Sequence, residues 1–297
     1  MLQGFDLSHF SNRKSLQLFL KVLCERLEMT YRKIWWNDFS AFEFHGIDPN
    51  KTIAVFPTAA VEQHGPHLPV GTDTIINQGH LDLLVERAPH DLDIRILPVQ
   101  AIGKSNEHIW QTGTLSHTAT NLIDAWTQIG LEIARAGVKK VVFVNSHGGN
   151  VSILDIVARE LRVRAGMLAV KTGWSQYWPK DIYSDIENRH GIHGGDSETS
   201  VVMHLRPELV NRDKLQDYPS VAARDEQAYK YMRPIGPTSY AWIASDINPL
   251  GTAGDAHLAT ADKGRITVET AVGSFIELLR EVERYPLPGT RDQGTKP

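Results

Sequence analysis

Short apolar segments alternate with longer segments of helical periodicity from Met29 onward. The short segments are rich in β-branched residues, which is typical of buried strands. They comprise residues 52–56, 94–100, 140–145 and 167–171. The helical segments comprise residues 74–87, 118–136, 151–165, 196–205 and 261–283. Because strands that alternate with helices form parallel sheets covered on both faces, the pattern predicts an α/β fold with a mostly parallel sheet.

The two ends of the chain differ from this pattern. Residues 1–28 are interpreted as an N-terminal extension, helical in part, which is either an added arm or the product of a misplaced start before Met29. The Pro-rich residues 285–297 are interpreted as a flexible tail. The segment between the two ends shows no internal repeat, so residues 29–284 are expected to form a single catalytic domain.

Composition excludes several classes of partner. The net charge is -4 and no cluster of Lys and Arg stands out, which argues against nucleic acid. No apolar run approaches the ~18 residues that cross a membrane. Residues 1–28 show no basic start followed by an unbroken apolar core, which argues against a secretory signal. The single cysteine, Cys24, permits no internal disulfide, so a cytoplasmic location is expected.

Polar side chains crowd the loop that follows the first predicted strand, VEQHGPHLPVGTD. Glu62, His64, His67 and Asp73 are costly to bury unless they are paired or bind a metal. The Pro and Gly residues between them forbid a regular helix or strand and favour a fixed loop that aims its donors inward. The alternative is a solvated surface loop in which His67 and Asp73 cap the next helix.

Two later loops carry the same residue types. In NSHGGN, His147 lies two residues beyond the strand 140–145, and HGIHGGDSETS contains His193 and Glu198. A strand-end His can be a satisfied core residue, and Glu198 is favoured in any case at a helix N-terminus. However, functional groups of parallel sheets gather beyond the carboxyl ends of the strands. Carboxylates and imidazoles from three such loops are what a pair of divalent metal ions requires.

These three motifs together resemble the creatininase family, the metal-dependent creatinine amidohydrolases and their relatives. The resemblance covers roughly residues 29–283. It implies a three-layer α/β/α sandwich and a homo-oligomer, often a hexamer. It also implies two divalent ions per chain, Zn or Mn with Fe as a further candidate, bridged by a carboxylate and a hydroxide.

The resemblance assigns roles to individual residues. It makes Asp73 the bridging carboxylate, and it makes Glu62 and His64 ligands of opposite ions. His147 becomes a further ligand. His193 takes the place of the catalytic His that shuttles a proton to the leaving nitrogen.

One position departs from the creatininase pattern. Creatininases carry an acidic ligand two residues after the strand-end His, where this chain has Gly149. Glu198 is expected to replace that ligand. The change argues against creatinine itself as the substrate.

Several further residues are candidates for contact with the substrate. EHIWQTGTLSH resembles the Gly-Thr loop of the family, which suggests that Gly113 and Thr114 line the pocket. In the same segment, Glu107 and His108 are interpreted as a surface pair rather than as ligands. The aromatic candidates are Trp174, Trp178 and Trp242, for which a place in the core or at an interface is the alternative.

The sequence therefore predicts a binuclear metal-dependent hydrolase of C–N bonds other than ordinary peptide bonds. A small cyclic, lactam-like amide is the expected substrate. A deformylase or peptidase-like relative that acts on an open-chain amide is the alternative, and a metal-binding protein without turnover is the rival from another class.

Overall fold

A computed structural model of the chain describes residues 32–289. The predicted N-terminal extension, residues 1–28, and the last residues of the predicted tail, 290–297, lie outside the described residues. The segment that begins at Trp35 separates as a compact unit, and all the elements described below belong to it.

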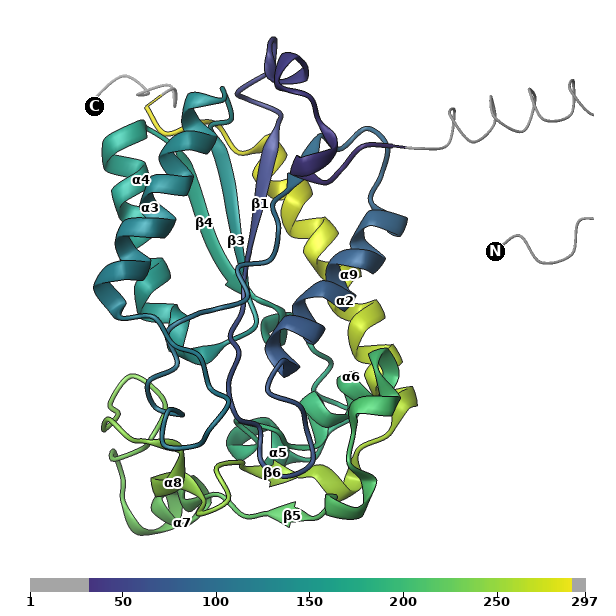
Figure 1. The fold of residues 1–297 in the computed structure, drawn as a ribbon, viewed down its shortest axis with the longest axis vertical. Coiled ribbons are helices and arrows are strands. Elements are labelled where there is room, and N and C mark those ends of the chain that lie inside the picture. The colour runs from purple at the N-terminus through teal and green to yellow at the C-terminus, as the bar shows by residue number, and fades with distance from the viewer. Residues whose placement is uncertain (1–31, 290–297) are drawn as a thin grey trace, which may run out of the picture. The chain divides into compact units, whose positions relative to one another are not determined.

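Four parallel strands form the central sheet in the order β2-β1-β3-β4 (Figure 1). Their bounds are Ile53–Thr58 for β1, Ile94–Ile96 for β2, Lys140–Asn145 for β3 and Leu168–Gly173 for β4. Every residue of the central strands β1 and β3 is buried, as expected for a sheet covered on both faces. The strand predicted at 94–100 is shorter than expected, because Pro98 has no N–H to donate to a ladder.

Helices cover both faces of the sheet, which confirms the α/β/α sandwich (Figure 1). One face carries α3 (Ala119–Arg135) and α4 (Val151–Ala165). The other face carries α2 (Thr72–Arg87) and α9 (Ala261–Arg284), and α6 (Asp196–Leu205) packs on α9.

Aromatic side chains fill the layer between the sheet and α3. Phe56 of β1 and Phe143 of β3 have ring centroids 4.9 Å apart, and Trp126 of α3 meets Phe56 at 6.4 Å. All three are buried in one apolar cluster. Their burial fixes the side of the sheet on which α3 lies, since each large apolar side chain contributes about 1.5–3 kcal/mol when it leaves water.

The ends of the long helices have identifiable causes. Thr118 and Thr260 cap α3 and α9 with side chains that accept hydrogen bonds from backbone N–H groups. Gly166 ends α4 in the left-handed conformation, at φ 66°. Lys140, buried at the start of β3, donates to the carbonyl oxygens of Val282, Glu283 and Tyr285 at 2.6–2.9 Å. This lysine ties the last turn of α9 to the sheet.

Several short elements gather beyond the carboxyl ends of the strands, in the lower part of Figure 1. They are α5 (Asp185–His190), α7 (Val221–Ala228), α8 (Ala244–Ile247) and the two-stranded sheet of β5 (Asp217–Tyr218) and β6 (Gly254–Asp255). Short 3-10 helices span Trp36–Asp38, Ala41–Phe44, Gly148–Asn150, Trp174–Tyr177, Pro207–Leu209, Arg212–Lys214 and Ala256–Leu258. None was predicted, because each is too short to show a periodic pattern.

Within the described residues, no helix is both long enough and apolar enough to span a membrane.

The packing of α6 against α9 can be tested by comparing the effect on stability of substituting two glycines of α9. A Cβ at Gly264 would overlap the carbonyl oxygen of Ser200 and lie 2.5 Å from its carbonyl carbon, whereas a Cβ at Gly273 meets nothing within 4 Å. Gly264→Ala is therefore expected to lower the free energy of unfolding by about 1–3 kcal/mol. Gly273→Ala, exposed in the same helix, is expected to raise it by about 0.5–1 kcal/mol. Urea unfolding measures both, and equal effects would contradict this packing.

Candidate metal centre

The centre is built where adjacent strands end. β1 and β3 pair in parallel, so the loops that follow them leave the sheet side by side. The first loop supplies Glu62 and His64, and the loop after β3 supplies His147. The remaining predicted residues are Asp73 in the first turn of α2, His193 in the loop before α6, and Glu198 in the first turn of α6. The structure thus brings all six predicted residues into one cluster.

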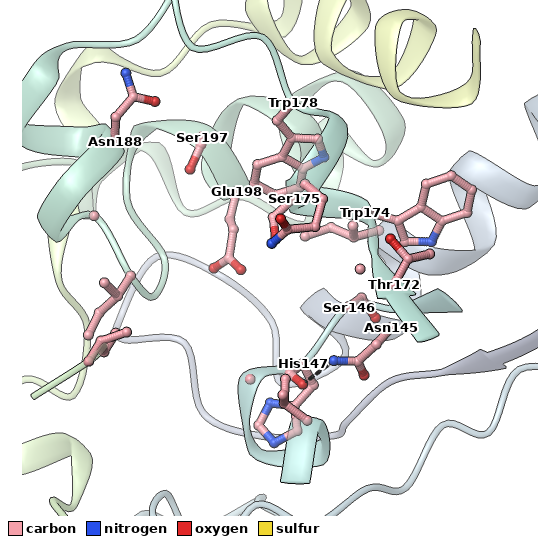
Figure 2. Close-up of a pocket in the computed structure, with 18 of the residues that line it drawn as sticks. Asn145, Ser146, His147, Thr172, Trp174, Ser175, Trp178, Asn188, Ser197 and Glu198 are labelled. Carbon is pink, nitrogen blue, oxygen red and sulfur yellow. Dashed lines mark hydrogen bonds between the residues drawn. The ribbon is translucent and has the colours of Figure 1, made fainter. Parts of the chain in front are cut away.

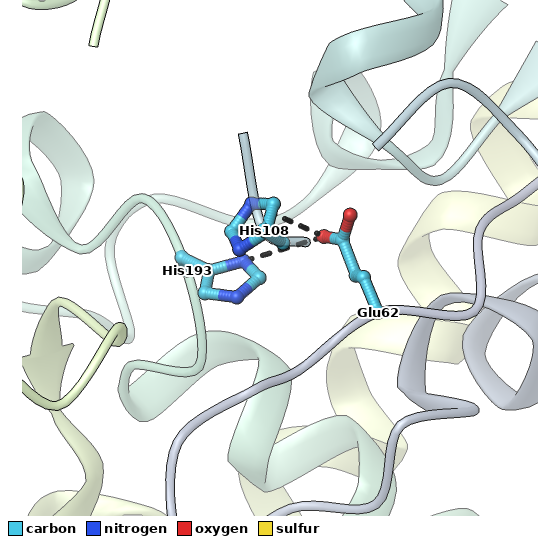
Figure 3. A group of neighbouring side chains, drawn as sticks. All are labelled: Glu62, His108 and His193. Atoms are coloured by element: carbon cyan, nitrogen blue, oxygen red, sulfur yellow. Dashed lines mark ion pairs between the residues drawn. The ribbon is translucent and has the colours of Figure 1, made fainter. Parts of the chain in front are cut away.

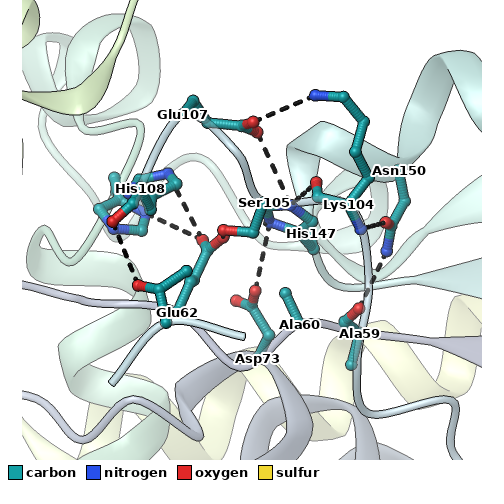
Figure 4. A network of polar contacts seen from close by, with 12 residues as sticks. Ala59, Ala60, Glu62, Asp73, Lys104, Ser105, Glu107, His108, His147 and Asn150 are labelled. Atoms are coloured by element: carbon teal, nitrogen blue, oxygen red, sulfur yellow. Dashed lines mark hydrogen bonds and ion pairs between the residues drawn. The ribbon is translucent and has the colours of Figure 1, made fainter. Parts of the chain in front are cut away.

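Asp73 lies between two imidazoles. Its Oδ1 atom is 3.4 Å from Nε2 of His64, and its Oδ2 atom is 3.3 Å from Nδ1 of His147 (Figure 4 shows Asp73 and His147). Glu62 Oε2 approaches the same His147 nitrogen at 3.1 Å, and Glu198 Oε2 approaches the same His64 nitrogen at 3.7 Å. Two sets of donors therefore share one carboxylate.

Backbone carbonyls orient the two imidazoles. Nδ1 of His64 donates to the carbonyl oxygen of Glu62 at 3.0 Å, and Nε2 of His147 donates to that of Lys104 at 2.8 Å. Since a carbonyl oxygen only accepts hydrogen bonds, each of these nitrogens carries a proton. The second nitrogen of each ring then faces the carboxylates, as in metal-ligating histidines.

Two of these atoms have no hydrogen-bond partner among the described residues. Nε2 of His64 and Oδ2 of Asp73 are both buried and unsatisfied. A buried polar atom without a partner is costly, and a divalent cation would satisfy both atoms at once. Imidazole and carboxylate donors are also the ligands that Zn and Mn accept. The residues present therefore fit a metal centre.

The ionisable groups of the cluster shift one another strongly. Burial alone would raise the pKa of Asp73, but His64 and His147 hold it at about 2. Burial alone would lower the pKa of His64, but Asp73 and Glu198 raise it to about 9. Burial, aided by the nearby Asp73, raises the pKa of Glu198 to about 7. A cation that binds His64 must therefore displace a proton, so metal affinity should rise with pH.

A cavity of about 810 Å³ opens on His147 and Glu198 (Figure 2). Trp174 and Trp178, both predicted to contact substrate, contribute to its lining. The Trp174 indole is fully buried and donates to Oδ1 of Asn77 at 3.1 Å, so it also serves the core. Nε1 of Trp178 is buried without a hydrogen-bond partner in the described part of the chain. Because this nitrogen is buried, it is not exposed to the cavity that the indole lines.

The other predicted substrate contacts lie elsewhere. Thr114 Oγ1 accepts from the backbone N–H of Gln63 at 3.1 Å and donates to the His108 carbonyl at 3.2 Å. Neither Gly113 nor Thr114 belongs to the described lining of the cavity. Trp242 meets His108 edge-on, with ring centroids 6.5 Å apart. Contact of these three residues with a substrate stays a prediction.

The prediction that Glu107 and His108 form a surface pair is wrong. His108 is 2% exposed, and its Nε2 atom lies 3.7 Å from Oε1 of Glu62 (Figure 3). Nδ1 of His193 lies 3.6 Å from the same oxygen, Oε1 of Glu62. Burial, together with His64 and His108, lowers the pKa of His193 well below its usual value. The missed signal was a His beside a Glu in a loop that leaves the same edge of the sheet as the other motifs.

Glu107 fills the space over Gly149. Its carboxylate lies 3.8 Å from Nε2 of His147 and pairs with Nζ of Lys104 at 3.2 Å (Figure 4). A Cβ at Gly149 would overlap the Glu107 carboxylate and the Lys104 carbonyl oxygen, and would lie 2.5 Å from Nε2 of His147. The side chain missing at position 149 is thus replaced in space by one from another loop.

Comparisons with known proteins agree with this arrangement. Residues 37–279 match the family model described as "Creatininase: Creatinine amidohydrolase". The chain is 31% identical over 234 residues to the mycofactocin precursor peptide peptidase of Mycolicibacterium smegmatis, covering 78% of this chain and 85% of that protein. It is 26% identical over 272 residues to the creatinine amidohydrolase of Pseudomonas putida, covering 84% of this chain and 95% of that protein.

Solved structures of creatininase share the fold. A manganese form superposes with a TM-score of 0.67 at 21% identity, covering 86% of this chain and all of that one. A variant described as Zn-Zn type gives a TM-score of 0.67 at 22% identity, with the same coverage.

The close contacts around Gly149 predict that substitution there affects metal binding, and the neighbouring Gly148 serves as the control. Gly149→Ala is expected to displace the His147 ring from the Lys104 carbonyl, and so to lower zinc affinity by ~10–100-fold. Gly148→Ala, with nothing within 4 Å of its Cβ, should leave affinity unchanged. Competition with a chromophoric chelator measures both. Unchanged affinity in Gly149→Ala would show that the ring tolerates displacement.

Proposed function

Since the chain belongs to the creatininase family, we propose that it is a metal-dependent amidohydrolase that uses a pair of divalent ions. The observation that carries the proposal is the carboxylate of Asp73, whose two oxygens face two different imidazoles. A carboxylate in that position suits a bridge between two ions.

The donor sets suggest which residues hold each ion. Glu62, His147 and one oxygen of Asp73 would hold the first, and His64, Glu198 and the other oxygen of Asp73 the second. Zn and Mn are the expected ions, with Fe as a further candidate. When bound, the pair supplies a hydroxide-like water as nucleophile and polarises the amide carbonyl.

His193 is proposed to shuttle a proton. Its Nε2 atom is occupied by the carbonyl oxygen of Gln63, at 2.6 Å, so Nδ1 is the nitrogen free for chemistry. That nitrogen faces Glu62 inside the cluster. A proton accepted there from the attacking water can pass to the leaving nitrogen, a contribution that is typically ~10²–10⁴ in rate.

A small cyclic amide is the proposed substrate, by the resemblance of the three motifs to an amidohydrolase family. Trp178 lines the cavity, and an aromatic side chain there suits contact with the flat face of such a ring. Creatinine itself is disfavoured, because Gly149 leaves no room for the acidic ligand of creatininases.

An open-chain amide is the second candidate, and two observations favour it. The cavity of about 810 Å³ falls in the range of ~300–1,000 Å³ that holds drug-sized ligands, which are much larger than a simple lactam. The relative from M. smegmatis is, by its name, a peptide peptidase. A metal-binding protein without turnover is disfavoured, because no predicted ligand is missing from the cluster.

The organisation of the chain also stays a proposal. A single catalytic domain at residues 29–284 is supported by the family match at 37–279. Assembly as a homo-oligomer, a hexamer by resemblance to the family, and a cytoplasmic location are proposed on the same grounds.

The function is tested with a panel of substrates. Protein loaded with Zn or Mn is expected to hydrolyse at least one lactam or hydantoin, and to lose that activity with a chelator. Release of product is followed by mass spectrometry, with creatinine, formamides and short peptides beside the cyclic amides. Turnover confined to formamides or peptides would replace the cyclic substrate by the second candidate. No metal-dependent turnover on any amide would overturn the proposal.

The bridging role of Asp73 predicts how metal content responds to mutation. Elemental analysis of the reconstituted chain is expected to find about two ions, more than a single tetrahedral site holds. Asp73→Ala should lose both ions, since both depend on its oxygens, whereas His64→Ala should lose mainly one. Equal retention in the two variants would contradict the assignment.

A further inference from the structure

Gln63 lies between the two imidazoles that flank Glu62, and its amide has one possible orientation. Oε1 accepts a hydrogen bond from the backbone N–H of Gly65 at 2.9 Å, and Nε2 donates to the carbonyl oxygen of Gly251 at 2.6 Å. Exchanging the two atoms would set N–H against N–H at Gly65 and oxygen against oxygen at Gly251. Gln63 is 6% exposed, so water does not replace these partners.

Gly251 makes this approach possible. Its φ of 75° lies in the left-handed region, and a Cβ there would lie 2.6 Å from Oε1 of Gln63. The amide thus packs directly on backbone.

The second hydrogen of the Gln63 amide determines the tautomer of His108. Nε2 of Gln63 lies 2.7 Å from Nδ1 of His108, so Nδ1 is an acceptor and the ring proton is on Nε2. That N–H faces Oε1 of Glu62 at 3.7 Å. A protonated nitrogen cannot bind a metal, so the orientation of one amide removes His108 from the ligand set.

The backbone of Gln63 determines the tautomer of His193. Its carbonyl oxygen lies 2.6 Å from Nε2 of His193, which therefore carries the proton. The 3.4 Å approach of the Gln63 amide nitrogen to the same atom is then a contact between two donors, not a hydrogen bond. Nδ1 of His193 is left with a lone pair toward Oε1 of Glu62.

We propose that Gln63 is a positioning residue that gives the two imidazoles over Glu62 opposite roles. His108 turns a protonated nitrogen toward the Glu62 carboxylate, at 3.7 Å, and His193 presents a lone pair to the reaction. The group Glu62, His108 and His193, although composed of ligand-type side chains (Figure 3), consequently holds no third ion. The inference rests on the proposed metal centre. The other oxygen of Glu62 is positioned separately, by a hydrogen bond from the Ser105 hydroxyl.

Neutron crystallography of the zinc-loaded full chain tests the proposal without a substrate. The expected result is deuterium on Nε2 of both His108 and His193, with none on Nδ1 of His108. Deuterium on Nδ1 of His108, or zinc bound to its Nε2, would overturn the proposal. Because the readout requires no turnover, an inactive protein would count against the proposed function alone.

Two substitutions at position 108 supply a second readout. His108→Gln keeps an N–H donor near Glu62, whereas His108→Leu removes it. His108→Gln should keep its full metal content and should be more active than His108→Leu. His108→Leu should lose ~10–100-fold in zinc affinity or in kcat/KM. Loss of one ion in His108→Gln would make His108 a ligand and end the proposal.

Gln63→Glu supplies the matched test of the positioning residue. A carboxylate of the same shape donates neither to Gly251 nor to His108, so zinc affinity should fall by ~10–100-fold. Gln227→Glu, an exposed site on α7, is the control and should change nothing. Wild-type affinity in Gln63→Glu would show that the tautomer of His108 does not depend on this amide.

Discussion

The site depends on one carboxylate that is shared between two imidazoles. Asp73 is 1% exposed, and burial of an ionised carboxylate is tolerated only where opposite charge compensates for the lost water. His64 and His147 supply that compensation from two loops that are far apart in the sequence. The other features of the centre position these three side chains. Backbone carbonyls accept hydrogen bonds from the two rings, and Glu62 and Glu198 lie beside the rings.

The fold explains why the loops meet. Because β1 and β3 pair in parallel, the loops that follow them leave the sheet at the same edge. Asp73 lies near that edge because it belongs to the first turn of α2, which follows the first of these loops. Glu198 arrives separately, on α6, whose position is set by backbone contact between Ser200 and Gly264 of α9. Lys140 fastens the far end of α9 to β3. The half of the centre that contains Glu198 is thus positioned by the packing of α6 on α9.

The sequence predicted the parallel sheet, the five long helices and the cluster of candidate ligands, because these have periodic or dense local signals. It did not predict what depends on contacts between loops. Gln63 stands in the first motif, yet its importance lies in a hydrogen bond to Gly251, which is remote in sequence. His108 resembles a surface residue until the fold buries it. The tautomer of each histidine is determined by its hydrogen-bond partners. Those partners are brought together by the tertiary structure, so no local sequence pattern encodes the tautomer.

The surroundings of Gly149 show how a loop remote in sequence can supply charge beside a candidate ligand. The carboxylate of Glu107 occupies the space where a side chain at position 149 would lie, pairs with Lys104, and approaches Nε2 of His147 at 3.8 Å. Glu107 is not among the residues that line the cavity, so this negative charge lies near His147 without contributing to the described lining. Since that cavity opens on His147 and Glu198, these two residues mark the side of the centre that a substrate would approach. The volume of the cavity favours an open-chain amide and the resemblance of the three motifs favours a cyclic one, so the two substrate classes are distinguished by how much of the cavity each would fill.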